Sequence, residues 1–160
     1  MAAKRRILFL CTGNCCRSPM AEALLRHVSA GRYESLSAGA HPAGFVHDLA
    51  IEVLREAGVD VKGLESKHIQ DFVPPHGTPP DLVISVCDSA AKECPVFPGK
   101  VDRLLWPFPD PIFAMGDRED RLRVFRRVRD SIRTRIEKAI AAGELEPPPA
   151  GEGHGRSSGP

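Results

Sequence analysis

One cysteine and one arginine, Cys11 and Arg17, are spaced in this sequence as a nucleophile and an anion-binding residue would be. A strand that turns through a glycine and an asparagine into a helix leaves several backbone N–H groups without intrahelical partners. Such groups, at the positive end of the helix dipole, bind tetrahedral oxyanions. We therefore expect the substrate, a phosphate-like oxyanion, to be bound by Thr12, Gly13, Asn14, Cys15, Cys16 and Arg17.

The thiol of Cys11 should be reactive in this loop. A thiol beside an always charged guanidinium has a lowered pKa, so we expect the pKa of Cys11 to fall from ~8.5 into the range of roughly 3.5–7.5. The planar fork of Arg17 can hold two oxygens of a tetrahedral anion. The hydroxyl of Ser18 can donate to the Cys11 sulfur. The sequence thus predicts nucleophilic catalysis with these three residues; the alternative is a buried cysteine followed by an exposed arginine.

The cysteines favour redox or catalytic roles over structural disulfides. They number five, an odd count, and we expect no export signal before them. None of their spacings is the C-x2-C pair of a zinc ribbon, and no histidine lies at a partnering interval. We therefore expect neither a metal site nor a cofactor.

Composition and charge narrow the class of protein. The chain has 160 residues, 42% of them hydrophobic and 27% charged, with a formal net charge of +1. These values are typical of one water-soluble domain and give no reason to expect nucleic-acid or membrane partners. The apolar stretch near the N-terminus is too short for a signal peptide or a membrane span, so we expect a cytoplasmic protein.

The elements that position the candidate loop alternate between strand and helix. Residues 6–10 form an apolar run that predicts a buried strand before the loop, and residues 20–28 follow it with helical spacing. Alternation of this kind indicates parallel pairing with right-handed crossovers. Further strands are predicted at 33–38, 81–86 and 101–106, and further helices at 46–57, 69–72, 88–94 and 117–142.

The predicted fold is therefore α/β, a three-layer α/β/α arrangement with a four-stranded parallel sheet and helices on both faces. Residues 1–143 should form a single catalytic domain, and 144–160 a disordered tail rich in Pro, Gly and Ser. The strand at 81–86 delivers Cys87 to the sheet edge where Cys11 lies, so the two thiols should be neighbours. The arginines of the last helix are expected to form a solvated face, or alternatively a docking patch for a partner.

The spacing Cys11-x5-Arg17-Ser18, with Asp110-Pro111 far downstream, resembles the low-molecular-weight protein tyrosine phosphatase superfamily. This superfamily includes the thioredoxin-coupled arsenate reductases. The resemblance covers about residues 6–143. For a phosphatase it implies that Cys11 attacks phosphorus, that Asp110 protonates the leaving group, and that water later hydrolyses the phosphocysteine.

The segment 86–95 resembles the redox segment of the arsenate reductases, in both of its cysteines and in their interval. The resemblance implies that arsenate forms an adduct with Cys11, that Cys87 attacks the Cys11 sulfur to release arsenite, and that Cys94 moves the disulfide outward. A regular helix would hold Cys87 and Cys94 too far apart to bond, so the short helix between them must loosen. The reductant is expected to be thioredoxin, glutaredoxin or a small thiol.

Other residues keep alternatives open. Pro19 and Cys16 match the phosphatases, and a protective Cys11–Cys16 disulfide is a second redox role. A non-catalytic arsenic-binding or partner-binding module is a third reading. Polar residues that bind potassium in some reductases are matched at Asn14, Glu22 and Ser37, although His68 stands near the place of an acidic ligand.

Overall fold

The protein is described by a computed structural model that covers residues 3–149. Its centre is a four-stranded sheet made of β1 (Arg6–Cys11), β2 (Glu34–Gly39), β3 (Leu82–Ser85) and β4 (Asp102–Leu105). The strand order is β2-β1-β3-β4, and every pairing is parallel. The predicted parallel sheet is confirmed, with each strand within two residues of its expected bounds.

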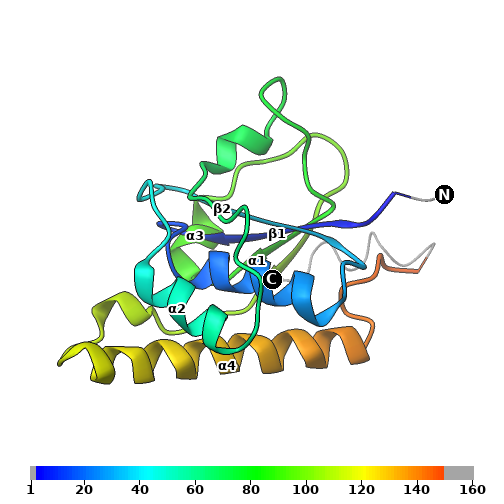
Figure 1. Cartoon of the computed structure of the whole chain (residues 1–160). Helices are drawn as coiled ribbons and strands as arrows, with labels where there is room; N and C mark the ends of the chain where they lie inside the picture. The colour runs from blue at the N-terminus through cyan, green and yellow to red at the C-terminus, as the bar shows by residue number, and fades with distance from the viewer. Residues whose placement is uncertain (1–2, 150–160) are drawn as a thin grey trace.

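Four helices and two short 3-10 turns lie between and after the strands. They are α1 (Arg17–Val28), α2 (Asp48–Glu56), η1 (Ile69–Phe72), α3 (Asp88–Lys92), η2 (Pro111–Phe113) and α4 (Arg118–Ala141). Figure 1 shows α1, α2 and α4 together on one side of the sheet, while the segment that holds η1 lies on the other side. The predicted α/β fold is confirmed, with the long helices gathered on one face. No helix within residues 3–149 combines the length and the apolar character needed to cross a membrane.

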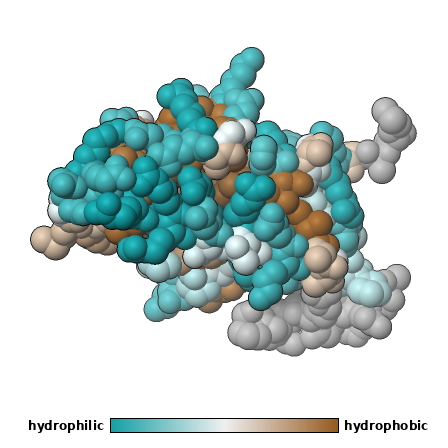
Figure 2. Space-filling view, turned by 60° about the horizontal axis from the view of Figure 1, so that its bottom comes forward, coloured by the Kyte–Doolittle hydropathy of each residue, from teal (hydrophilic) through white to brown (hydrophobic). Residues whose placement is uncertain are grey.

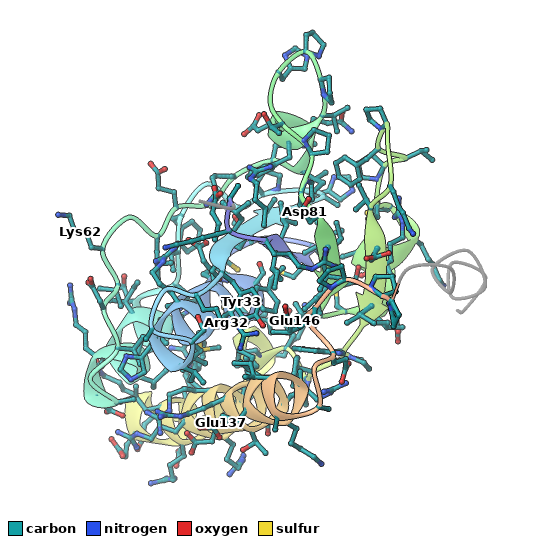
Figure 3. The ribbon with its side chains drawn as sticks, turned by 90° about the vertical axis from the view of Figure 1, so that its right-hand side faces the viewer. Arg32, Tyr33, Lys62, Asp81, Glu137 and Glu146 are labelled. Carbon is teal, nitrogen blue, oxygen red and sulfur yellow. The ribbon has the colours of Figure 1, made fainter. Side chains whose placement is uncertain are left out.

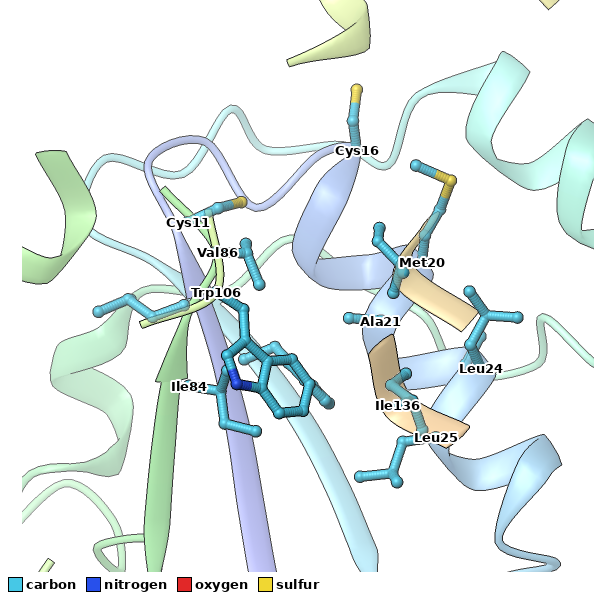
Figure 4. Packing of buried hydrophobic residues seen from close by; sticks show 14 of the residues in the cluster. Cys11, Cys16, Met20, Ala21, Leu24, Leu25, Ile84, Val86, Trp106 and Ile136 are labelled. Carbon is cyan, nitrogen blue, oxygen red and sulfur yellow. The ribbon is translucent and has the colours of Figure 1, made fainter. Parts of the chain in front are cut away.

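The core forms where α1 and α4 pack against the central strand. Residues 7–10 of β1 are fully buried, because β1 has a strand on each side and covered faces above and below. Figure 4 shows Ala21 and Leu25 of α1 near Ile136 of α4, with Trp106 packed over the strands. The site at the end of β1 therefore follows a fully buried central strand of the sheet.

Helix α4 bears a buried apolar stripe along one side and charges along the other. The buried residues of this stripe are Leu122, Phe125, Val128, Ile132, Ile136 and Ala139, and Ile140 continues it half-buried. Several arginines of the opposite side form ion pairs with glutamates of α2 and of α4 itself. Figure 2 shows this side of the molecule as mostly hydrophilic, with limited hydrophobic areas. The charged side of α4 is therefore a solvent-exposed face with several ion pairs.

The folded domain extends past the predicted boundary at residue 143. Leu145 is fully buried, and its carbonyl accepts a hydrogen bond of 2.8 Å from Arg5 Nε. Glu146 pairs with Arg32 and accepts a hydrogen bond from Tyr33, as Figure 3 shows from the right-hand side. The predicted disorder of 144–160 is thus wrong for residues 144–146, because one apolar side chain finds a place in the core. Residues 150–160 lie outside the described part of the chain.

Candidate active site

The loop between β1 and α1 is supported from behind by the chain that follows β2. The carbonyl of Thr12 accepts from the His41 N–H at 2.8 Å, and that of Gly13 accepts from Ala43 at the same distance. β2 ends at Gly39, where a Cβ atom would lie 2.7 Å from the Thr12 carbonyl oxygen, so only glycine fits. Asn14 adopts a positive φ of 47°, which asparagine tolerates better than most residues and which turns the chain towards α1.

Several backbone N–H groups of this loop have no hydrogen-bond acceptor in the part of the chain that the structure describes. Within residues 3–149, the N–H groups of Gly13, Cys15 and Cys16 have no hydrogen-bond acceptor. The Asn14 N–H donates to Cys11 Sγ at 3.2 Å. Unpaired amides at the start of a helix favour an anion, as predicted from the sequence. The loop therefore has the chemistry of an oxyanion site.

Cys11 lies at the end of β1 with its sulfur inside the loop. Its Sγ is 2.7 Å from Ser18 Oγ, the contact that was predicted for Ser18. Burial raises the pKa of the Cys11 thiol, although the hydrogen bonds of Ser18 and Asn14 and the charge of Arg17 all act to lower it. The predicted fall in the pKa is therefore wrong for this structure, because Cys11 is 2% exposed and loses its hydration.

A buried polar network continues from Ser18 into the sheet. Asn14 Nδ2 donates to Ser18 Oγ at 2.8 Å and to Ser37 Oγ at 3.0 Å, and Ser37 donates to Glu22 Oε1 at 2.5 Å. The Lys67 N–H donates to Asn14 Oδ1 at 2.6 Å. All four polar side chains of this network are buried. The network fixes Asn14, and with it the turn of the loop.

The same polar residues do not fit a potassium ion in this chain. The Arg26 guanidinium lies 2.8 Å from Glu22 Oε2, and the Lys67 ammonium lies 3.8 Å from Glu22 Oε1. Two cations of the chain itself therefore already face the carboxylate. His68 directs its ring nitrogen to the backbone N–H of Gln70 at 3.0 Å, so it adds no ligand on this side. Lys67 had not been singled out from the sequence, because its backbone contact with Asn14 has no sequence signal.

Arg17 joins the loop to the chain that follows β4. Its Nη2 lies 3.2 Å from Asp110 Oδ2, and its Nη1 donates to the Phe108 carbonyl at 3.1 Å. The other oxygen of Asp110 accepts from the Ile112 N–H at 3.1 Å and so caps η2. Asp110 therefore caps the turn η2 with one carboxylate oxygen and contacts Arg17 of the loop with the other.

Cys87 lies beside the loop, as the parallel sheet predicts. It follows β3 at the N-terminus of α3, and its Sγ is 3.5 Å from Thr12 Oγ1. Burial acts to raise the pKa of Cys87, but hydrogen bonds from Thr12, Ala90 and Ser89 and the charge of Arg17 together lower it below the usual value. Of Cys11 and Cys87, it is therefore Cys87 whose ionisation the structure favours.

Cys94 lies beyond the end of α3. The helix stops at Lys92, two residues earlier than predicted, and the Cys94 N–H is 3.5 Å from the nearest helical carbonyl. Burial raises the pKa of the Cys94 thiol, with Arg103 acting against it. Glu93 contacts His41 Nε2 at 2.7 Å, which ties this segment to the chain behind the loop. All five cysteines are free thiols.

Comparisons with known proteins agree on one family. A model described as "Low molecular weight phosphotyrosine protein phosphatase" matches residues 6–146. An arsenate reductase of Shouchella clausii is 39% identical over 142 residues, which cover 89% of this chain and 99% of that protein. An arsenate reductase of Bacillus subtilis (strain 168) is 36% identical over 138 residues, 86% of this chain and 96% of that protein.

Solved structures agree with these relatives. A thioredoxin-dependent arsenate reductase of Corynebacterium glutamicum superposes with a TM-score of 0.66 at 29% identity, covering 91% of this chain and 65% of that one. An arsenate reductase in the phosphate-binding state gives 0.65 at 31% identity, covering 86% and 98%. A tyrosine phosphatase of Erwinia amylovora gives 0.67 at 21% identity, covering 88% and 94%, which is evidence for the fold alone.

Proposed function

The chain belongs to the low molecular weight phosphotyrosine protein phosphatase family, and within it we propose that this protein is an arsenate reductase that uses Cys11, Cys87 and Cys94 in series. The observation that carries the proposal is the place of Cys87. The Cys87 thiol has a lowered pKa and contacts Thr12 of the oxyanion loop. A hydrolase needs no second thiol at this position. The arsenate reductases at 36–39% identity support the same activity.

The first step joins arsenate to Cys11. The unpaired amides and the fork of Arg17 hold the oxyanion. As the Cys11 sulfur attacks arsenic, the arsenate dianion accepts the proton of the thiol. One As–S bond forms and one As–O bond breaks. With a further proton from Asp110, which lies 3.2 Å from Arg17, the departing oxygen leaves as water.

The second step reduces arsenic. The Cys87 thiolate attacks Cys11 Sγ, an S–S bond forms, and the S–As bond breaks with its electron pair remaining on arsenic. Arsenic(V) thereby becomes arsenic(III) and leaves as arsenite, while two sulfurs become a Cys11–Cys87 disulfide. The lowered pKa of Cys87 supports its role as the attacking thiol.

The third step transfers the disulfide outward. Cys94 attacks Cys87 Sγ, a Cys87–Cys94 bond forms, and Cys11 leaves as a thiolate. The helix between them has only five residues, too few to be stable on its own, so its unwinding costs little. An external dithiol then reduces the Cys87–Cys94 bond. We propose thioredoxin for this role, since a solved relative is thioredoxin-dependent; glutaredoxin with glutathione is the competing reductant.

Phosphatase activity is the second candidate, and the contact between Arg17 and Asp110 favours it. A general acid held next to the anion-binding arginine suits ester hydrolysis as well as arsenate reduction. In this case Asp110→Asn should slow the hydrolysis of a chromogenic phosphate ester by roughly 10²–10⁴-fold. If the variant hydrolyses the ester at the wild-type rate, the proton is not supplied by Asp110.

The deciding experiment compares two assays on the same variants. Arsenate turnover is followed with thioredoxin, thioredoxin reductase and NADPH, in parallel with ester hydrolysis; a second arm replaces thioredoxin with glutaredoxin and glutathione. Cys11→Ser should abolish both activities, whereas Cys87→Ser and Cys94→Ser should stop only repeated arsenate turnover. Wild-type protein that hydrolyses the ester but reduces no arsenate with either reductant would contradict the proposal.

A single addition of arsenate tests the order of the thiols. With Cys94→Ser, one arsenite should be released and a Cys11–Cys87 disulfide should accumulate, as seen by mass spectrometry of non-reduced peptides. With Cys87→Ser, little arsenite should form. A full equivalent of arsenite from the Cys87 variant, together with a Cys11–Cys94 or Cys11–Cys16 bond, would contradict this order.

A further inference from the structure

The oxyanion loop contains a second pair of thiols that the proposed relay does not use. Cys15 and Cys16 are consecutive residues at the start of α1, and their sulfurs are only 3.7 Å apart. Figure 4 shows Cys16 at the beginning of α1, away from the strand that ends in Cys11. Cys15 is 9% exposed and Cys16 is 2% exposed, so an incoming reagent meets Cys15 first.

The two thiols differ in reactivity. The two sulfurs lie within hydrogen-bonding distance, and with Cys16 as the donor the bond stabilises the thiolate of Cys15. This bond lowers the pKa of Cys15 to about 7, with burial and the Asp110 carboxylate acting against it and Arg17 acting with it. The same bond, together with burial, raises the pKa of Cys16. At neutral pH the pair therefore offers one nucleophilic sulfur and one neighbouring thiol that still holds its proton.

We propose that Cys15 and Cys16 form a dithiol site for trivalent arsenic, taken up as arsenous acid. Cys15 displaces the first hydroxide from arsenic and Cys16 displaces the second. In total two As–S bonds form, two As–O bonds break, and the two thiol hydrogens leave with the two hydroxyl groups as two molecules of water. Arsenic keeps one hydroxyl group and its oxidation state, so no oxidant or reductant is needed.

Both thiols are required for retention of arsenic. After the first As–S bond forms, the second sulfur is held within reach, and its reaction becomes intramolecular. Linking two binding events in this way strengthens binding by roughly 10²–10⁴-fold over one event alone. The spacing of 3.7 Å, set by the loop and the start of α1, means that arsenic can join the sulfurs without a large movement of the backbone.

The position of the pair gives binding a functional consequence. Arsenic held by Cys15 and Cys16 lies within the segment whose free N–H groups suit an oxyanion, and so it competes with arsenate. This consequence, inhibition by the product, rests on the proposed function. The binding itself does not, because arsenite can be offered directly to the reduced protein.

The test begins with a chain that retains only this pair. The triple variant Cys11→Ser, Cys87→Ser, Cys94→Ser is reduced with a phosphine, which is then removed by gel filtration. After addition of sodium arsenite, intact-mass spectrometry should find a single arsenic atom per chain. Adding Cys16→Ser should weaken retention by roughly 10²–10⁴-fold. The matched control is Cys15→Ser in the same background, which should lose as much. No arsenic on the pair-only variant, or undiminished retention without Cys16, would overturn the proposal.

A second measurement uses the wild-type chain and so does not depend on the folding of a multiple variant. Arsenite should protect Cys15, the more exposed and more reactive thiol of the pair, from a thiol-alkylating reagent, as read by peptide mass spectrometry. If Cys15 is alkylated at the same rate with and without arsenite, the site does not exist. Should the protein bind arsenite in these assays yet reduce no arsenate, the dithiol site stands and the proposed function fails.

Discussion

Asn14 stabilises the oxyanion loop in two ways, through the hydrogen bonds of its side chain and through its tolerance of a positive φ. The substitution Asn14→Ala removes both contributions. The side chain is fully buried. It donates to Ser18 and Ser37 and accepts from the Lys67 N–H. Alanine removes all three hydrogen bonds and leaves the Lys67 N–H without its partner. It also places a less tolerant residue at a φ of 47°.

The expected loss of stability follows from these contacts. A hydrogen bond contributes about 0.5–1.5 kcal/mol net, so three bonds contribute roughly 1.5–4.5 kcal/mol. The left-handed backbone costs alanine roughly 1–2 kcal/mol more. Allowing for some relaxation of the loop, Asn14→Ala should lower the free energy of unfolding by about 3–5 kcal/mol. That is a large share of the ~5–15 kcal/mol typical of a domain.

The matched control is Asn14→Gly, which loses the same three bonds but accepts the positive φ. The unfolded glycine chain is favoured by about 0.4–1 kcal/mol of entropy, so the glycine variant should be more stable than the alanine variant by only about 0.5–1 kcal/mol. Urea denaturation followed by Trp106 fluorescence gives both values. A loss below about 1 kcal/mol for Asn14→Ala would refute the importance of the network, and a glycine variant less stable than the alanine variant would refute the strain.

Three further outcomes are expected. Arg17→Lys should weaken the binding of inorganic phosphate, measured by calorimetry, because a point charge cannot reproduce a two-pronged grip; unchanged affinity would contradict the clamp. Glu93→Gln should speed hydrogen exchange in the segment before Cys94 by at most about fivefold, since an exposed side-chain contact such as that of Glu93 with His41 is worth less than about 1 kcal/mol; unchanged or slower exchange would show that the contact does not restrain the segment. Burial, helped by the hydrogen bond to Glu146, raises the pKa of Tyr33 to about 12, so its absorbance should titrate near 12 and stability should be lost as the pH rises from about 10 through this value. Glu146→Gln should lower that midpoint, and a wild-type midpoint near 10 would contradict the assignment.

Much of the fold was predictable because its signals are local. The apolar runs at 6–10 and 81–86 have the composition of strands buried on both faces, and apolar residues recur at helical spacing along α4 from Leu122 to Ala139. Parallel pairing then placed Cys87 beside the loop without further information. Where the sequence misled, the cause was tertiary. Leu145 is an isolated apolar residue among polar residues and prolines, yet its side chain is buried in the core and its carbonyl accepts a hydrogen bond from Arg5.

The chemistry of the site was predictable in its residues and less so in its electrostatics. Spacing identified Cys11 and Arg17, but the pKa of Cys11 depends on how deeply the loop is buried, which spacing does not measure. The guanidinium of Arg17 contacts both the Asp110 carboxylate and the Phe108 carbonyl, so part of its positive charge is already compensated. The contact between Glu93 and His41 joins segments 52 positions apart, and no sequence pattern in either segment predicts it.

The two ends of the sheet have different neighbours, and this bears on how the protein can be attached to a surface. Cys11 closes β1 at one end, whereas Glu146 is held by Arg32 and Tyr33 at the other, near the beginning of β2 (Figures 1 and 3). A tether joined after the proline run at 147–149 would therefore leave the domain on the side away from the thiols. On an electrode or a bead, such an anchoring would orient every molecule with its oxyanion loop towards the solution.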